Sequence, residues 1–192
     1  MYVRGRLPKD GVAVVGSRWP PSEAADFAYE LARRLRMPIV AGLAPGIDAA
    51  AHRGALAAGV PTVAFVPYGF GCTDPPEHGE LEAAIVASGG AIATLLPPGT
   101  PVSEQAKVER DRLQAEHARA VVLVCSEIDG GAMHTMRFAR ELGRPRFAVR
   151  PPRQAVGSYE WAGNLQCIAD GATVLAFDIN QALTVIHASQ PT

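Results

Sequence analysis

The turn after residue 41 is the first stretch whose residue types point to binding chemistry. Residues 39–41 form a short apolar run typical of a buried strand, and an alanine-rich segment with good helix propensity begins near residue 47. Two glycines lie in the turn between them. Glycine lets a ligand approach the bare backbone, and the first amides of a helix attract anions because they have no partner within the helix. The turn therefore predicts a phosphate site formed by Gly42, Leu43, Ala44 and Gly46.

Two other turns carry groups that suit the same chemistry. The predicted strand over residues 12–15 is followed by a glycine, a serine and an arginine, which supply a hydroxyl and a guanidinium group for phosphate oxygens. The predicted strand over residues 120–125 leads to a pair of glycines at a helix start, with a histidine in the first turn. The residues expected to bind phosphate at these turns are Gly16, Ser17, Arg18, Gly130, Gly131 and His134.

Other reactive residues form no catalytic constellation. Asp48 and His52 lie four apart on one helical face, a spacing that fits an acid–base pair but more often leaves the aspartate at the turn and the histidine in the core. Cys72 follows a glycine-rich turn, but the sequence places no base beside it. Three cysteines without C-x-x-C spacing and five scattered histidines predict neither a disulfide framework nor a metal site. We therefore assign no catalytic residue, metal or cofactor.

Strands and helices alternate along most of the chain, and this alternation must position the turns. Apolar runs predict strands over residues 12–15, 39–41, 62–66, 91–95, 120–125, 146–149 and 173–177. Helical patterns are expected over residues 22–35, 47–56, 81–87, 103–118, 132–142 and 180–188. Alternating strands and helices indicate an α/β fold with a mostly parallel sheet and helices on both faces, in which ligands bind beyond the carboxyl ends of the strands.

The pattern predicts a single Rossmann-like domain over residues 11–189, preceded by an N-terminal extension over residues 1–10. Residues 1–11 and 190–192 are expected to be frayed ends, because neither stretch shows a buried pattern. A chain of 192 residues, of which 48% are hydrophobic, is large enough to build the core of one such domain.

Charge and hydropathy limit the function classes. A net charge of −1 argues against a protein that coats nucleic acid through its overall field, although six arginines fall between residues 137 and 153. The sequence shows neither a signal-peptide pattern nor an apolar run long enough to span a bilayer, so we expect a cytoplasmic protein without membrane contact. Neither G-x-G-x-x-G nor the P-loop motif is present, which argues against a typical nicotinamide site and a P-loop ATPase.

The turn motifs resemble those of the DNA-processing protein A (DprA/Smf) family. V-V-G-S-R at residues 14–18 and A-G-L-A-P-G-I-D-A-A-A-H-R-G-A-L at residues 41–56 match the most specific motifs of that family. Further matches occur in the same order, with R-D-R where the family has R-N-R and G-G-A where it has S-G-S. These matches lie at residues 97–101, 110–112, 130–132, 141–149, 163–165 and 170–172. The resemblance covers roughly residues 11–177.

The resemblance implies a non-enzymatic protein that binds single-stranded DNA in a basic pocket at the strand ends. It also implies a homodimer that passes the DNA to the recombinase RecA during DNA uptake and recombination. In such a pocket Arg110 and Arg112 would join Arg18 in holding phosphates. Glu109 and Glu116 flank this segment, and their charges would repel phosphate. Stacking on aromatic rings supports single-strand binding, and the aromatic residues expected to contribute are Tyr68, Phe70 and Trp161.

The wider superfamily offers an alternative. It includes nucleotide sensors and the lysine-decarboxylase-like (LOG) phosphoribohydrolases, which cleave nucleoside monophosphates and carry a P-G-G-x-G-T-x-x-E signature. Residues 129–139 keep the glycine pair of that signature but lack its final glycine, threonine and catalytic glutamate. The alternative to DNA is therefore a small nucleotide, bound by a sensor or cleaved by a LOG-like hydrolase.

Overall fold

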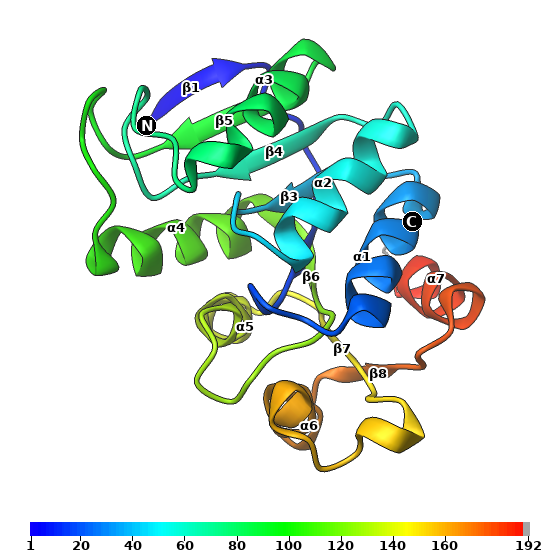
Figure 1. Cartoon of the computed structure of the whole chain (residues 1–192). Helices are drawn as coiled ribbons and strands as arrows, with labels where there is room; N and C mark the ends of the chain where they lie inside the picture. The colour runs from blue at the N-terminus through cyan, green and yellow to red at the C-terminus, as the bar shows by residue number, and fades with distance from the viewer. Residues whose placement is uncertain (190–192) are drawn as a thin grey trace.

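An eight-stranded sheet forms the centre of the computed structural model, which describes residues 1–189 (Figure 1). The strands are β1 (Tyr2–Gly5), β2 (Gly11–Val15), β3 (Ile39–Ala41), β4 (Thr62–Phe65), β5 (Ala91–Thr94), β6 (Ala118–Leu123), β7 (Arg146–Val149) and β8 (Thr173–Leu175). The α-helices of the described residues are α1 (Ser22–Leu35), α2 (Ile47–Ala57), α3 (Gly79–Ala87), α4 (Glu104–His117), α5 (Ala132–Glu141), α6 (Ala162–Ala169) and α7 (Ile179–Ala188). The predicted single α/β domain with a mostly parallel sheet is confirmed.

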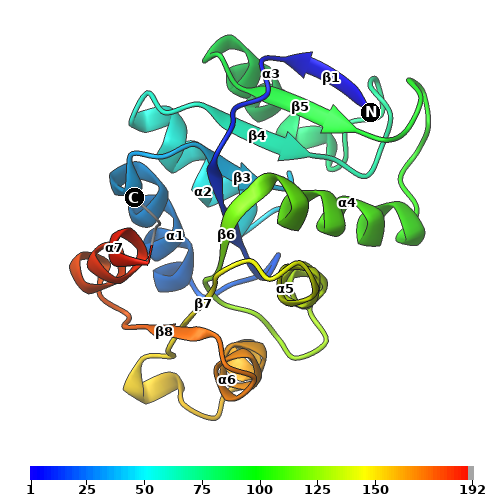
Figure 2. The same ribbon diagram turned by 180° about the vertical axis from the view of Figure 1, so that it is seen from behind.

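The strand order determines where a ligand can reach the sheet. The order is β1-β5-β4-β3-β2-β6-β7-β8, and every pair from β5 to β8 is parallel (Figure 2). From β2 the chain builds outward toward β5, and from β6 it builds outward in the opposite direction. The sheet therefore has its topological switch point between β2 and β6, where the loops that follow the two strands diverge and leave a crevice.

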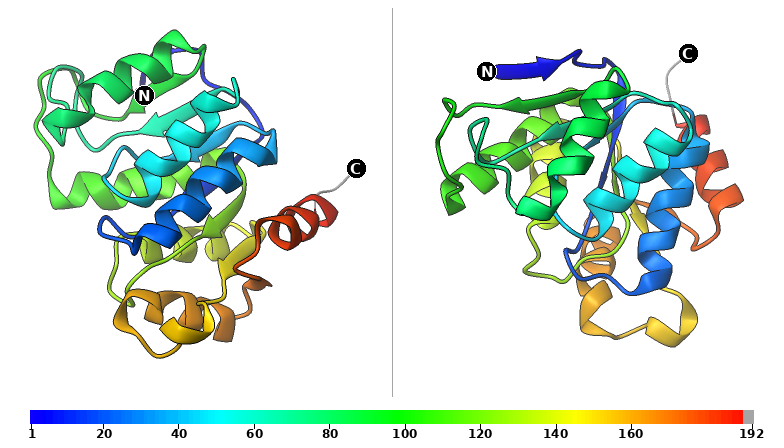
Figure 3. Two further views of the ribbon diagram at one scale, coloured as in Figure 1. Left: turned by 45° about the vertical axis from the view of Figure 1, so that its right-hand side comes forward. Right: turned by 45° about the horizontal axis from the view of Figure 1, so that its top comes forward.

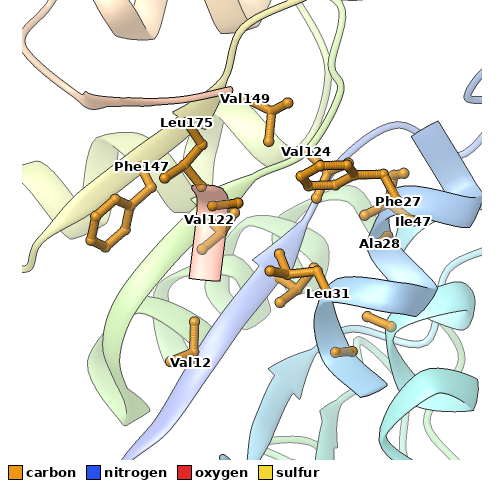
Figure 4. Packing of buried hydrophobic residues seen from close by; sticks show 14 of the residues in the cluster. Val12, Phe27, Ala28, Leu31, Ile47, Val122, Val124, Phe147, Val149 and Leu175 are labelled. Atoms are coloured by element: carbon orange, nitrogen blue, oxygen red, sulfur yellow. The ribbon is translucent and has the colours of Figure 1, made fainter. Parts of the chain in front are cut away.

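Helices cover both faces of the sheet. α1, α2, α3 and α7 lie on one face, and α4, α5 and α6 lie on the other (Figures 1 and 3). The alternation of side chains along β2 produces this division, because Val12 and Val14 pack with Leu31 of α1, whereas Ala13 and Val15 pack with Met136 of α5. Figure 4 shows Val12 and Leu31 in the first of these two cores. Both faces of the central strands are buried, as the short all-apolar runs predict.

Two segments differ from the sequence prediction. Residues 2–5 are not frayed, since β1 pairs antiparallel with β5 and Arg4 forms an ion pair with Glu82 of α3. All four β1 residues are exposed, so the strand leaves no burial pattern in the sequence. α6 was not predicted because it is short and contains Gly163 and Asn164, which have low helix propensity. The expectation for residues 190–192 lies outside the described residues.

None of the helices within residues 1–189 combines the length and the apolar character that crossing a membrane requires.

Candidate functional site

A cavity of about 470 Å³ opens at the switch point. Its lining comes from the loop after β2, the loop that joins β6 to α5, and α4. The two loops are joined because the Ser17 amide donates a hydrogen bond of 2.7 Å to the Cys125 carbonyl. The predicted residues that line the cavity are Gly16, Ser17, Arg18, Ala44, Arg110, Gly130, Gly131 and His134. The structure places Gly42, Leu43, Gly46 and Arg112 outside the lining of this cavity.

The turn around Gly42 packs against other protein groups instead of facing the cavity. The Gly42 amide donates to Asp48 Oδ2 at 3.1 Å, and its carbonyl accepts from His52 Nε2 at 2.6 Å. A Cβ atom at Gly42 would lie 1.8 Å from Arg110 Nη1, so the glycine makes room for the guanidinium group and not for a ligand. Leu43 is 1% exposed, and Gly46 packs against the Ser17 carbonyl with a φ of 75°. Gly42, Leu43 and Gly46 therefore do not face this cavity, contrary to the expectation that all the phosphate-binding turns meet at one site.

Arg110 and Arg112 separate because residues two apart on a helix point to different sides. Arg110 is 8% exposed, and its Nε lies 2.9 Å from Asp111 Oδ1. Its Nη1 lies 3.9 Å from Asp48 Oδ2, so two buried carboxylates surround its charge. Arg112 is exposed, pairs with Glu116 at 2.9 Å and lies over the Phe138 ring. Arg110 thus reaches the cavity with its charge balanced, and Arg112 does not reach it.

The cavity is not the basic pocket that the resemblance implied. Glu116 pairs with Arg112, and Glu109 accepts from Gln105 at 2.8 Å, so neither of the two suspected glutamates lines the cavity. Five other carboxylates line it, against the three cations Arg18, Lys107 and Arg110. The carboxylates are Asp48, Glu104, Asp111, Glu127 and Asp129. The excess of carboxylates over cations could not be predicted from the sequence, because these residues lie far apart in the chain.

The Ser17 side chain holds the two loops together. Its hydroxyl donates to Glu127 Oε1 at 2.7 Å and accepts from the Trp19 amide at 3.1 Å. Ser17 is 5% exposed, so its main contact is with protein. Arg18, which follows it, is exposed at the cavity, and no hydrogen bond or ion pair joins its side chain to another residue within 1–189.

The N-terminus of α5 also opens on the cavity. Gly130, Gly131 and Ala132 line it, and the amides of Gly131 and Ala132 donate no hydrogen bond to any group within residues 1–189. The Ser126 side chain packs closely against Gly130, and a Cβ atom at this position would lie 2.4 Å from Ser126 Oγ. The amides at the start of this ten-residue helix are therefore free to bind an anion, and the phosphate binding expected at the glycine pair stays a prediction.

The aromatic residues at the cavity are not those predicted from the sequence. Tyr68 and Trp161 are fully buried, and Phe70 lies beneath the Arg4 guanidinium group. Instead Trp19 is 81% exposed and Tyr159 is 58% exposed, and both line the cavity. The position of Trp19, directly after the Gly-Ser-Arg turn, was a usable signal. Tyr159 begins a short 3₁₀ helix after β7 and leaves no such signal.

Asp48 and His52 have the structural roles that their spacing more often indicates. Asp48 accepts from the Gly42 amide, and His52 is fully buried with its Nδ1 2.7 Å from Thr62 Oγ1. Burial raises the pKa of Asp48 to about 6, although the Arg110 guanidinium acts in the opposite direction. Burial also lowers the pKa of His52 to about 4.

The variant His52→Gln should reveal the opposing pH effects of these two residues. As the pH rises from 4 to 6, Asp48 lowers the stability, because the folded state holds its proton at a higher pH than the unfolded chain does. His52 raises the stability over nearly the same range, because only the unfolded chain binds its proton there. The free energy of unfolding of His52→Gln, minus that of the original protein, should therefore fall by up to about 3 kcal/mol as the pH rises from 4 to 6.5.

Urea denaturation at stepped pH measures this difference, and Asp48→Asn should change the relative stability with pH in the opposite direction. Parallel profiles for the three proteins would contradict these pKa shifts.

The comparisons with known proteins show the family of this chain. The family model for DNA recombination-mediator protein A matches residues 1–187. The chain belongs to this DNA-processing protein A family. The predicted resemblance is thereby confirmed, and it extends through β1, which the motifs did not include.

The chain matches only part of the length of individual family members. A DNA processing protein DprA of Mycobacterium tuberculosis is 41% identical over 144 residues, which are 73% of this chain and 36% of that protein. The X-ray structure of DNA processing protein A from Streptococcus pneumoniae has a TM-score of 0.85 and 26% identity, covering 96% of this chain and 62% of that chain. The chain thus spans only part of these relatives.

A more distant DNA processing protein A shares the fold. The Helicobacter pylori protein, known for a single-stranded DNA binding mode, has a TM-score of 0.84 and 20% identity, and the match covers 99% of this chain and 87% of that chain.

Proposed function

We propose that this DNA-processing family member binds single-stranded DNA at the cavity between β2 and β6 and performs no chemistry on it. The observation that carries the proposal is the pair of exposed aromatic side chains, Trp19 and Tyr159, beside Arg18 at the cavity. Exposed aromatic rings offer stacking surfaces to bases, and an adjacent cation tracks the phosphate backbone. The single-stranded DNA binding of the Helicobacter pylori relative supports the same assignment.

The phosphates have donors at the cavity. Arg18 has no paired carboxylate, and Lys107 pairs with Glu104 at 2.6 Å, a contact that water screens because the Glu104 side chain is 89% exposed. The Gly131 and Ala132 amides add uncharged donors at the helix start. These groups hold a strand through its phosphates while the bases stack.

The same proposal includes the proteins that assemble with this chain. Membership of the family supports a homodimer that delivers the strand to a RecA-type recombinase in the cytoplasm during DNA uptake. A binding role without catalysis agrees with the positions of Ser17 and Glu127, whose hydrogen bond holds two loops together and leaves Ser17 buried.

A small nucleotide is the second candidate, because a cavity of about 470 Å³ lies within the usual range for one small ligand. Thermal unfolding with and without mononucleotides tests this candidate. Release of free base from a nucleoside monophosphate would show that the protein also has the LOG-like hydrolase activity.

Fluorescence anisotropy with a labelled mixed-sequence oligonucleotide across a salt series tests DNA binding. Two phosphate contacts, at Arg18 and Lys107, should make log affinity fall with log salt at a slope of about −1.4. Arg18→Ala should reduce the slope by about 0.7, and Trp19→Ala should cost about 1–3 kcal/mol of binding free energy with little change of slope.

Matched controls keep this test specific. Arg112→Ala removes an exposed arginine outside the cavity, and Tyr2→Ala removes an exposed aromatic ring on β1. Both control variants should bind like the original protein. If no oligonucleotide binds at low salt while a mononucleotide raises the melting temperature, the DNA proposal is refuted.

A further inference from the structure

Two carboxylates at the cavity have oxygens that accept no hydrogen bond from the described part of the protein, and a phosphate cannot use them because it is itself an acceptor. Glu127 Oε1 accepts from Ser17, and Asp129 Oδ1 accepts from the Tyr159 hydroxyl at 2.5 Å. Within residues 1–189 no donor contacts the second carboxylate oxygen of either residue. Both carboxylates come from the loop between β6 and α5, so two acceptor groups stand beside the exposed Tyr159 ring.

These carboxylates determine which part of a nucleotide can enter the cavity. A carboxylate is only an acceptor when ionised, and it repels phosphate oxygens. The phosphates therefore stay at Arg18, Lys107 and the α5 amides, and the group that faces Glu127 and Asp129 must present hydrogen-bond donors. Within a DNA strand these donors are the N–H groups of the bases, because the internal deoxyribose sugars carry no hydroxyl. A base stacked on Tyr159 satisfies both requirements, since the ring and the Asp129 carboxylate are joined by a hydrogen bond.

The four bases differ in the donors that they offer at the Watson–Crick edge. Guanine presents two parallel donors, N1–H and the 2-amino group, which match the two oxygens of one carboxylate, because the oxygen that already accepts from Ser17 or Tyr159 keeps a second lone pair. Adenine and cytosine each offer one amino group beside an acceptor nitrogen, and thymine places a carbonyl oxygen on each side of its N3–H. Two parallel hydrogen bonds to a charged group are stronger and more selective than one. A carboxylate at a base site therefore favours guanine and disfavours thymine.

We propose that Glu127 and Asp129 make this cavity a guanine-selecting base pocket. The inference rests on the proposed binding of single-stranded DNA, and it adds a base preference that phosphate contacts and stacking cannot supply, because those contacts are nearly independent of sequence.

The test compares short oligonucleotides by anisotropy at one low salt concentration. The probes are an all-thymine nonamer and the same strand with one central guanine, inosine or 7-deazaguanine. A bidentate pair discriminates between bases by about 1–3 kcal/mol, so the guanine strand should bind about 5- to 150-fold more tightly than the all-thymine strand. Inosine lacks the 2-amino group and should lose most of this gain, whereas 7-deazaguanine should keep it because its Watson–Crick edge is unchanged.

The variants assign the preference to the two carboxylates. Asp129→Asn alters an exposed side chain and should weaken the guanine preference, and Glu127→Gln with Asp129→Asn should abolish it while the all-thymine strand still binds. Thermal unfolding of each variant verifies that the fold is intact, and Asp129→Asn remains informative if Glu127→Gln disturbs the Ser17 contact.

Two failures are distinguishable in this experiment. If no probe binds, the proposed DNA function fails and the guanine inference fails with it. If all four probes bind equally well, or if both variants keep the full guanine preference, DNA binding stands and the guanine inference is overturned.

Discussion

Replacing Arg110 with methionine should destabilise the fold by about 3–5 kcal/mol, the usual cost of removing one partner from a buried ionic network. Arg110 is 8% exposed, and its guanidinium group lies 2.9 Å from Asp111 and 3.9 Å from Asp48. Those carboxylates are themselves 5% and 6% exposed, so without Arg110 they would be buried charges with no ion-pair partner among residues 1–189. Methionine fills much of the same volume, which limits the effect of an added cavity.

Urea denaturation at neutral pH measures this cost, and Arg112→Met provides the control. Arg112 is two residues away on the same helix but exposed, and its pair with Glu116 is worth little, so its replacement should change the stability by less than about 1 kcal/mol. Adding Asp48→Asn and Asp111→Asn to Arg110→Met should recover much of the loss, because no unpaired charge would then remain. Equal stabilities for the Arg110 and Arg112 variants would contradict the buried network.

Asn164→Ala should be the second severe variant, with a loss of about 3 kcal/mol. Asn164 is fully buried, and its side-chain oxygen accepts from the Ser126 amide at 2.9 Å. Its side-chain nitrogen donates to the carbonyls of Val149 at 2.8 Å and Val124 at 3.0 Å. Alanine would leave these backbone groups buried without partners, and each such group costs about 1–3 kcal/mol, partly relieved by relaxation.

The same variant should weaken ligand binding, because Asn164 fixes the start of the loop that carries Glu127 and Gly130. Thermal unfolding and the anisotropy assay measure the two effects on one sample. Gln166→Ala, on the exposed side of α6, is the matched control and should leave both unchanged. A stable Asn164→Ala protein with normal binding would show that the loop does not depend on this side chain.

Local patterns in the sequence were sufficient to predict most elements of the fold. Every predicted strand is present, and the strands at residues 39–41 and 146–149 have the predicted bounds. Apolar runs and glycine turns encode such elements because strand and helix periods depend on neighbouring residues. The pattern missed β1, which is held by pairing with β5 and not by burial.

The candidate site was only partly predictable. The turns at Ser17–Arg18 and Gly130–Gly131 do meet at one cavity, as parallel strands require. The charge at the cavity could not be predicted, because it depends on contacts such as Ser17–Glu127, which joins residues 110 apart in the chain. Exposure was equally unpredictable, since Trp161 is buried beside Phe177 while Trp19 is open to solvent.

The sequence by itself determined the α/β class, the family and the turns that reach the carboxyl edge of the sheet, because these properties are written in short motifs and local periodicity. The tertiary structure alone decided that β2 and β6 are neighbours, that Arg110 is neutralised by Asp48 and Asp111, and that carboxylates outnumber cations around the cavity. Each of these depends on which distant segments pack together, and that choice follows from burial of the whole core and not from any local stretch.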